Sequence, residues 1–319
     1  MWEVAGRVSA PSQFGAEMDA HGRFVRQASA FRGDVDTSGG AADPARYHLY
    51  VSLACPWAHR VVIARALKGL DQVLGMTVVD PIRDERGWAF RPEPDPLTGF
   101  DFLAQAYHRS DPSWRGRVTV PVLWDIRAAR IVNNESEDIV RILDGAFGGH
   151  ARMAPCLRPH ELAARIDDAN GVVYPLLNNG VYRAGFATTQ RAYNEAAAGV
   201  AEGLHRVEQV LRGDRWLVGN RFTEADIRLF TTLVRFDPVY HTHFKCNARL
   251  VGDSEALVGY LRDIAQIPGV MDTIDMGQIK RHYYLTHDKL NPVGIVPVSD
   301  GPDLTRPHGR AALGPDALA

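Results

Sequence analysis

The strongest constraint on the fold is a change of sequence texture near Pro159. Before that point, short runs rich in β-branched and aromatic residues alternate with stretches of helical spacing. After it, strand-like runs give way to apolar residues at helical spacing over residues 162–177, 188–211, 224–234 and 254–264. A chain of 319 residues with this change predicts an α/β domain followed by an all-helical domain.

The first half reads as a thioredoxin-like α/β unit. Tyr47–Leu53 predicts a buried strand that stops before Pro56, and the following apolar face predicts a helix that ends at Gly69. A second strand is expected over residues 73–79, followed by a proline-rich stretch. Residues 118–124 and 129–133 predict an antiparallel pair, and a helix should start near Glu135. The order β-α-β, insertion, β-β-α is typical of the thioredoxin-like arrangement.

These patterns divide the chain into four parts. We expect an irregular N-terminal arm over residues 1–45 and a thioredoxin-like domain over residues 46–150. An all-helical domain over residues 160–290 and an extended or loose tail over residues 291–319 should follow. In the helical part, Thr223 is a predicted N-cap with Asp226 three residues on, and Phe222 can pack onto Ile227.

Charge and cysteine content narrow the class of protein. A net charge of −2 with 45% apolar and 23% charged residues removes the bulk electrostatic case for a nucleic-acid or membrane partner. Three scattered cysteines, Cys55, Cys156 and Cys246, are the profile of a reducing compartment, so we expect a cytoplasmic protein. The start Met1–Arg7 shows no secretion signal, and His48–Leu67 is too interrupted by charge to span a membrane.

Cys55 is the residue that carries chemistry in this reading. It lies between the predicted strand and helix, where unpaired backbone N–H groups and the helix dipole favour a thiolate. A dithiol oxidoreductase would have a second cysteine at position 58, but that residue is Ala58. A mixed disulfide on Cys55 must therefore be resolved by a thiol from solution, for which glutathione is the obvious candidate. The alternative is that Cys55 is only a small buried residue.

Two further features fit a glutathione site. If the Val120–Pro121 peptide bond is cis, the backbone of Val120 faces Cys55 and can pair with a peptide like an added strand, although proline can also simply mark a strand edge. At the start of the next helix, Ser136 and its N–H can hold a carboxylate while Glu135 takes an ammonium group. Both groups occur on the γ-glutamyl end of glutathione. Alone, this Glu-Ser pair would only be a helix cap.

A metal site is the competing interpretation of one cluster. His241, His243 and Cys246 are potential ligands close in sequence, but no fourth ligand is evident. We therefore expect packing and hydrogen bonding there, and no bound metal. Cys156 and Cys246 are expected to be structural.

Six segments, taken in order, resemble the glutathionyl-hydroquinone reductases, the xi class of glutathione transferases. The resemblance runs from about Ser29 to Pro297 and rests on Cys55–Arg60, Gly87–Phe90, Thr119–Asp125, Ile131–Ser136, Asn179–Ala187 and Arg281–Tyr284. It implies the glutathione S-transferase fold, a homodimer, no permanently bound cofactor, and glutathione as cosubstrate.

The resemblance also implies roles for particular residues. Cys55 would be the catalytic nucleophile. Glutathione would be contacted by Trp88, Arg117, Val120, Glu135 and Ser136. The aromatic substrate pocket would be lined by Tyr182, Tyr240 and Tyr283, of which Tyr182 and Tyr283 would also be catalytic, by bonding the ring hydroxyls and supplying a proton.

The implied reaction removes glutathione from an S-glutathionyl-hydroquinone through a Cys55–glutathione mixed disulfide, releasing hydroquinone and oxidised glutathione. An omega-like thiol transferase or dehydroascorbate reductase would share the Cys55 step and differ in its electrophile. A non-catalytic module of the same fold, binding a partner protein, is the alternative from another class.

Overall fold

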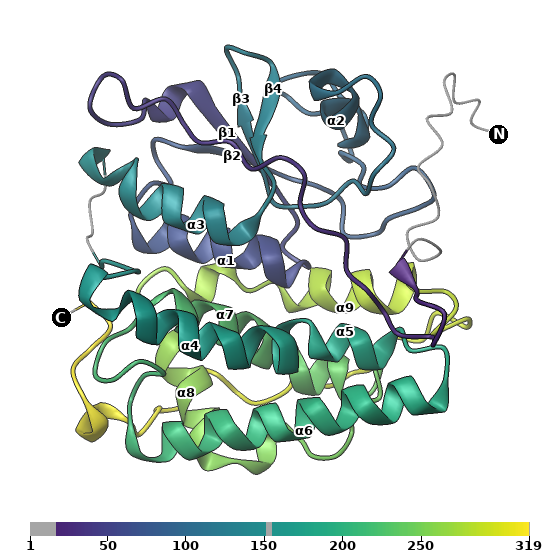
Figure 1. The fold of residues 1–319 in the computed structure, drawn as a ribbon, viewed down its shortest axis with the longest axis vertical. Helices are drawn as coiled ribbons and strands as arrows, with labels where there is room; N and C mark the ends of the chain where they lie inside the picture. The colour runs from purple at the N-terminus through teal and green to yellow at the C-terminus, as the bar shows by residue number, and fades with distance from the viewer. Residues whose placement is uncertain (1–16, 151–154, 319) are drawn as a thin grey trace.

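The computed structural model describes residues 17–150 and 155–318. The first sixteen residues of the expected arm, including the start where no secretion signal is expected, lie outside the described residues. The described part stacks a sheet-containing layer on a bundle of helices (Figure 1). No helix in these two ranges is long and apolar enough to cross a membrane.

The sheet has four strands in the order β2-β1-β3-β4. Their bounds are Tyr47–Val51 for β1, Gly75–Val78 for β2, Val122–Asp125 for β3 and Arg130–Asn133 for β4. β1 pairs with β2 in parallel and with β3 antiparallel, and β3 and β4 form an antiparallel pair. β3 is shorter than the predicted strand 118–124, because proline has no N–H to give to a ladder and the pairing starts only after Pro121.

Helices cover this sheet on the side of the bundle. α1 (Pro56–Leu67) and α3 (Ser136–Gly145) lie between the sheet and the helical domain, and α2 (Ala104–Ser110) packs near β4 (Figure 1). α2 lies within the proline-rich stretch, in which no element was predicted. As predicted, α1 has Pro56 in its first turn, and Gly69 follows its end with a φ of +63°.

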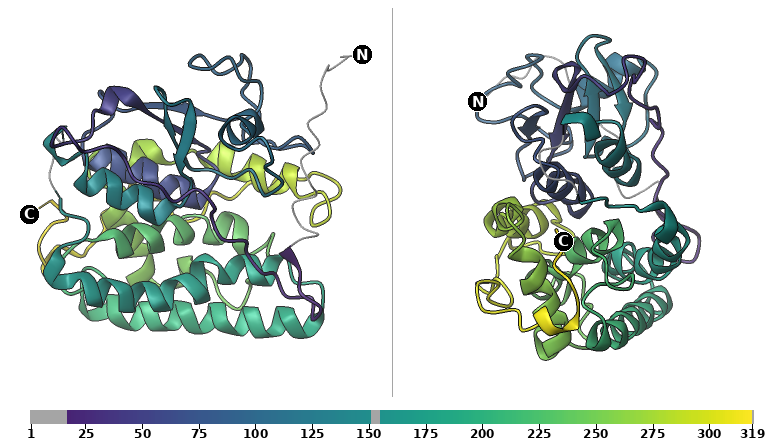
Figure 2. Two further views of the ribbon diagram at one scale, coloured as in Figure 1. Left: turned by 45° about the horizontal axis from the view of Figure 1, so that its top comes forward. Right: turned by 90° about the vertical axis from the view of Figure 1, so that its left-hand side faces the viewer.

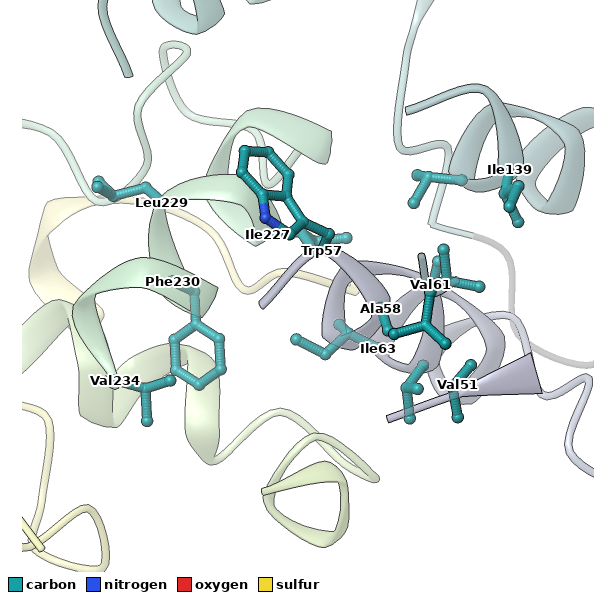
Figure 3. Packing of buried hydrophobic residues seen from close by; sticks show 14 of the residues in the cluster. Val51, Trp57, Ala58, Val61, Ile63, Ile139, Ile227, Leu229, Phe230 and Val234 are labelled. Atoms are coloured by element: carbon teal, nitrogen blue, oxygen red, sulfur yellow. The ribbon is translucent and has the colours of Figure 1, made fainter. Parts of the chain in front are cut away.

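The core of the molecule continues from one domain into the other through α1. Nearly every residue of α1 is buried, because one side meets the sheet and α3 while another meets α7 (Glu224–Leu233). Figure 3 shows Val61 and Val51 on the sheet side, and Phe230 and Val234 of α7 on the opposite side. The two domains therefore share one apolar interior, which fixes the position of the α1 N-terminus relative to the bundle.

The helical domain contains six α-helices among the described residues. Besides α7 these are α4 (Ala163–Val173), α5 (Gly180–Gly185), α6 (Gln190–Gly213), α8 (Glu255–Ala265) and α9 (Met276–Thr286). The predicted cap of α7 is confirmed, since Thr223 and Asp226 form a reciprocal capping box. α5 and α9 were not expected, and α9 carries Tyr283.

The N-terminal arm crosses both domains. From Glu17 to Asp43 it contains neither an α-helix nor a named strand, and it runs from the end of the helical domain at α5 and α6 to the sheet edge at β4 (Figures 1 and 2). At the helical end, Thr188 N–H donates to the carbonyl of Gly22 at 3.0 Å. At the sheet end, Gly33 N–H donates to the carbonyl of Val132 at 2.9 Å.

The C-terminal tail contains one short 3₁₀-helix, Ala311–Leu313, among its described residues, and its last part is anchored to the helical domain. Arg310 is buried, and its guanidinium donates to the carbonyls of Leu211, Ala256, Asp214 and Arg215 at distances from 2.7 to 3.3 Å. The composition of the tail could not predict this, because the partners of Arg310 lie 54 to 99 residues earlier in the chain.

Candidate active site

Cys55 is the N-cap residue of α1, directly after the short connection from β1. Its side chain is half-buried and caps no backbone N–H of the helix. The thiol donates to the carbonyl of Val120 at 3.7 Å, and the Val120–Pro121 bond is cis, as the sequence analysis considered. The structure thus places the thiol beside the one backbone segment predicted to pair with a peptide ligand.

A pocket opens at Cys55 between the two domains. It is lined from the thioredoxin-like side by Cys55, Pro56, Trp57, Arg83, Trp88, Arg117 and Thr119–Val120. From the helical side it is lined by Tyr182, Phe186, His282, Tyr283 and His287, and the arm adds Glu17, Phe24 and Arg26. A small molecule in this pocket would therefore touch the thiol and the tyrosines at once.

A second, adjoining pocket contains the predicted glutamyl site. Glu135 and Ser136 at the start of α3 line it, together with Ser29, Asn134 and Tyr174. Arg26, Trp57, Thr119 and Val120 line both pockets, so the two share a wall of side chains. Their arrangement suits an extended peptide with its amino-acid end at α3 and its thiol at Cys55.

Glu135 and Ser136 are held in place by neighbouring side chains. Ser29 of the arm donates to the Glu135 carboxylate at 2.9 Å, and Arg60 of α1 donates to the Ser136 hydroxyl at 3.4 Å. Arg60 also donates to Asn178 of the helical domain at 2.7 Å. Burial lowers the pKa of Arg60 to about 9, so this guanidinium stays charged at neutral pH. The first turn of α3 is thereby fixed from both domains.

Arg117, a predicted glutathione contact, is already paired in this structure. It donates to both oxygens of Glu17 at 2.7 and 2.9 Å, and the Glu17 side chain is fully buried. The glutathione contact of Arg117 stays a prediction, and the ion pair gives this residue a second role as the anchor of the arm.

Trp88, the other predicted contact, lines the pocket at Cys55 but is itself largely covered. Its indole stacks on His282 with ring centroids 5.0 Å apart and planes 21° apart, and the Arg83 guanidinium lies 4.8 Å from the ring centroid. Burial lowers the pKa of Arg83 to about 10, which leaves it charged at neutral pH. Arg83 therefore adds positive charge to the lining of the thiol pocket, and no sequence pattern indicated this role.

Three tyrosines form a hydrogen-bonded chain beside the thiol pocket. The hydroxyls of Tyr182 and Tyr283 are 2.6 Å apart, and those of Tyr283 and Tyr240 are 3.0 Å apart. Tyr182 and Tyr283 line the pocket, whereas Tyr240 is fully buried behind Tyr283 and is not among the lining residues. Desolvation raises the pKa of each phenol, so all three keep their protons at neutral pH. Tyr182 is the most accessible member of the chain.

Two histidines in the lining were not singled out from the sequence. His282 Nδ1 lies 2.6 Å from the carbonyl of Pro81, so this nitrogen carries the proton, and burial lowers the pKa of His282 to about 3. The His287 Nδ1 is 3.1 Å from Nε2 of His243, and burial holds the pKa of His287 well below its usual value. Both rings are neutral at pH 7. Adjacency to Tyr283 was the available signal for His282.

Neither the two other cysteines nor the two histidines of the metal candidate are among the residues that line the thiol pocket, although His243 contacts the lining residue His287. Cys246 is buried, donates to the carbonyl of Phe244 at 3.8 Å, and has a pKa raised to about 12 by desolvation. Cys156 is exposed. Across residues 17–150 and 155–318, no group of three or more His, Cys, Asp or Glu side chains could hold a metal ion.

Comparison with known proteins gives consistent matches over most of the chain. The family models for the N-terminal and C-terminal domains of glutathione S-transferase match residues 54–146 and 190–263. Two curated relatives are glutathionyl-hydroquinone reductases. YqjG of Escherichia coli is 49% identical over 91% of this chain and 92% of its own, and PcpF of Sphingobium chlorophenolicum is 50% identical over 87% and 90%.

Solved structures agree with these matches. The glutathione-bound structure of YqjG superimposes with a TM-score of 0.84 at 48% identity, over 88% of this chain and 96% of that one. A xi-class transferase from Natrialba magadii superimposes with a TM-score of 0.86 at 46% identity, over 90% of each chain.

Proposed function

The chain belongs to the glutathione S-transferase superfamily and, within it, to the glutathionyl-hydroquinone reductases of the xi class, and from this premise we propose that it removes glutathione from S-glutathionyl-hydroquinones. Glutathione is the cosubstrate, and the fold is that of the superfamily. The observation that carries the proposal is the shared pocket, in which a monothiol at a helix N-terminus faces a pair of hydrogen-bonded tyrosines.

The first half-reaction begins with the Cys55 thiolate. The N-terminus of α1 and the nearby Arg83 both favour a negative charge at this position. The thiolate attacks the sulfur of the glutathionyl-hydroquinone, forming the Cys55–S–SG disulfide while the bond between sulfur and ring carbon breaks. The electron pair of that bond stays on the ring carbon, which takes up a proton. The ring is thereby reduced to the free hydroquinone.

That ring carbon is a poor leaving group unless it is protonated as the bond breaks. The tyrosines can supply this proton. Tyr182 and Tyr283 retain their protons and line the pocket opposite Cys55. A hydroxyl that delivers its proton to this ring carbon as the carbon–sulfur bond breaks is worth about 10²–10⁴ in rate. We assign Tyr182 as the nearer donor and Tyr283 as its partner.

The second half-reaction restores the enzyme. A second glutathione, bound along Val120 with its amino-acid end at Glu135 and Ser136, attacks the glutathione sulfur of the mixed disulfide. Oxidised glutathione leaves and Cys55 returns to the thiolate, while the proton of the incoming thiol balances the one given to the ring. The overall change is glutathionyl-hydroquinone plus glutathione to hydroquinone plus oxidised glutathione.

Replacement of the thiol tests the covalent scheme. We expect Cys55→Ala to lose at least about 10³-fold of its turnover of glutathionyl-menadione, because no other group in the pocket is a comparable nucleophile. The wild type should show ping-pong kinetics, and Cys246→Ala, at a buried thiol outside the pocket, serves as the matched control. Retention of most activity by Cys55→Ala would refute the scheme.

A substrate panel separates this proposal from its alternatives. Faster turnover of a glutathionylated peptide or dehydroascorbate than of glutathionyl-menadione would favour an omega-like thiol transferase. Absence of glutathione binding and of all turnover would favour a non-catalytic interaction module. The tyrosine chain favours the hydroquinone, because a thiolate leaving group needs no proton from a phenol.

We also propose that the protein is a cytoplasmic homodimer. The resemblance to the xi class supports the dimer, and three free cysteines within the described ranges support a reducing compartment. Light scattering of the purified protein measures the oligomeric state, and a monomer at micromolar concentration would contradict the first part.

A further inference from the structure

We propose that the N-terminal arm supplies a glutathione-binding residue, and that Arg26 binds the α-carboxylate of the γ-glutamyl end. The inference deepens the proposed function and rests on it, since it takes glutathione as the ligand of this site. The arm, which belongs neither to the sheet nor to the helical bundle, would then contact the peptide directly.

Arg26 lies where the two pockets join. It lines the pocket at Cys55 and the adjoining pocket of Glu135 and Ser136, and among arm residues 17–45 it is the only one common to both. Its side chain is half-buried. A tripeptide that reached from α3 to the thiol would therefore lie within reach of Arg26.

The guanidinium of Arg26 has a stacking partner but no acceptor. It lies 4.2 Å from the ring centroid of Trp57, and the Arg60 guanidinium lies 4.4 Å from the same centroid. Within the described ranges, no hydrogen bond or ion pair involves Arg26. The ring holds the guanidinium plane in position while its N–H groups stay available to a ligand.

Neighbouring donors also lack acceptors. The indole Nε1 of Trp57 and the Nε of Arg60 are both buried and have no hydrogen-bond partner among the described residues. Trp57 itself is 6% exposed and lines both pockets. A buried donor without an acceptor costs about 1–3 kcal/mol, so these two donors, beside the half-buried guanidinium of Arg26 at the same ring, indicate a place for an anionic acceptor.

The surrounding charges select which carboxylate binds. Arg60 donates to Ser136 at 3.4 Å, so the Arg26–Trp57–Arg60 group adjoins the N-terminus of α3, where a carboxylate is favoured. Glu135 beside it can accept only a cation or a neutral donor. An α-carboxylate next to an α-ammonium satisfies both demands, whereas the glycyl end of glutathione has no ammonium group.

The arm is held rigidly enough for this role. Glu17 pairs with Arg117 at 2.7 Å, and Arg23 pairs with Glu195 of α6 at 2.8 Å, one contact in each domain on the same side of Arg26 along the chain. On the other side, Ser29 donates to Glu135 at 2.9 Å. These contacts order the arm before the ligand arrives. Binding therefore loses less conformational entropy than it would with an unordered arm.

Direct binding measurements test the assignment. Calorimetric titration with glutathione, in a Cys55→Ser background that removes disulfide chemistry, should give a dissociation constant about 10-fold higher for Arg26→Gln, or about 1.4 kcal/mol. Arg26→Lys should recover part of the loss, because it keeps the charge without the planar fork. Arg191→Gln, whose side chain is 86% exposed on α6, is the matched control and should leave binding unchanged.

A ligand that lacks the carboxylate identifies the contact. For 4-aminobutanoyl-cysteinyl-glycine, which lacks only the α-carboxylate, Arg26→Gln and its parent should bind equally. Unchanged glutathione affinity in Arg26→Gln, or an equal loss for both ligands, would overturn the assignment. These results do not depend on turnover, so an enzyme inactive towards glutathionyl-menadione would contradict the proposed function while the Arg26 contact is still tested.

Discussion

The tyrosine chain makes a graded prediction that depends on position. For Tyr182 to offer its proton to a substrate, it must accept a hydrogen bond from Tyr283, and Tyr283 can in turn accept one from Tyr240. This direction of donation leaves a single hydroxyl proton free, at the end of the chain that is most accessible from the pocket. The effect of removing each hydroxyl should therefore fall with distance from that end.

The expected sizes follow from the number of bonds that each change breaks. Tyr182→Phe removes the donor and should slow the first half-reaction about 10²-fold, or about 2.7 kcal/mol in the barrier, at the low end because Tyr283 lines the same pocket. Tyr283→Phe removes one neutral hydrogen bond to the donor and should cost about 5-fold, or about 1 kcal/mol. Tyr240→Phe, one bond farther away, should cost less than about 3-fold.

A single-turnover assay measures the relevant step. Stopped-flow release of menadiol from glutathionyl-menadione reports the first half-reaction, and reduction of a glutathionylated peptide by the same variant reports attack at a disulfide, whose thiolate leaves without a proton from tyrosine. Tyr193→Phe is the matched control, since its hydroxyl donates to the carbonyl of Lys245 outside the pocket. Equal slowing of both substrates by Tyr182→Phe would refute its role as proton donor, and so would no slowing at all.

Two further predictions concern stability. The free energy of unfolding should decrease as the pH is lowered from 6.5, because burial lowers the pKa of His243 to about 4 and that of His282 to about 3. Both values lie below the unfolded-state pKa near 6.5, so the stabilisation is complete above pH 6.5 and is lost as the pH falls. At pH 5 this pair accounts for a loss of roughly 4 kcal/mol. Urea unfolding at pH 7 and pH 5 measures the loss, to which the other buried neutral histidines, His59 and His287, add. His282→Gln should remove about 2 kcal/mol of it, and equal stability of the wild type at the two pH values would contradict the prediction. Arg310→Met should destabilise the protein by about 3 kcal/mol, because four carbonyls lose a charged donor. Arg306→Met, at an exposed arginine of the same tail, is the control, and a loss below about 1 kcal/mol in thermal or urea unfolding would show that the tail is not anchored in this way.

Local patterns were sufficient for the elements whose determinants are adjacent in sequence. The step from β1 through Cys55 into α1 and the capping box of Thr223 and Asp226 depend on neighbouring residues, and both were predicted. Glu135 and Ser136 were likewise placed at a helix start from their residue types, and α3 begins at Ser136. The same locality explains why the thiol and the candidate glutamyl site could be proposed before the fold was known.

Long-range contacts explain what the sequence did not predict. His282 and Tyr283 of α9 have a recognisable role only once the fold places them at the pocket. The hydrogen-bond acceptor of His282, the carbonyl of Pro81, lies 201 residues away in the chain. The arm likewise has no periodic pattern, because it is held by contacts with both domains, such as the pair of Glu17 with Arg117 and the backbone bond from Gly33 to Val132, and not by a helix or strand of its own. Neither periodicity nor turn chemistry reports contacts of this kind.

The candidate site is divided between two domains. The interface between them must therefore hold the thiol and the proton donors at a fixed distance from each other. Arg235, at the end of α7, is fully buried and donates to the carbonyls of Leu53 and Ala54 at 2.9 and 3.0 Å, directly before Cys55 in the chain. It also donates to Nδ1 of His59 in α1 at 3.0 Å, and burial holds the pKa of His59 well below its usual value, so that ring remains a neutral acceptor. A buried charge with all these acceptors is costly to separate from them. These hydrogen bonds therefore hold the segment that contains Cys55 against the domain that contains the tyrosines. A substrate can contact the thiol and the tyrosine hydroxyls without a large domain movement.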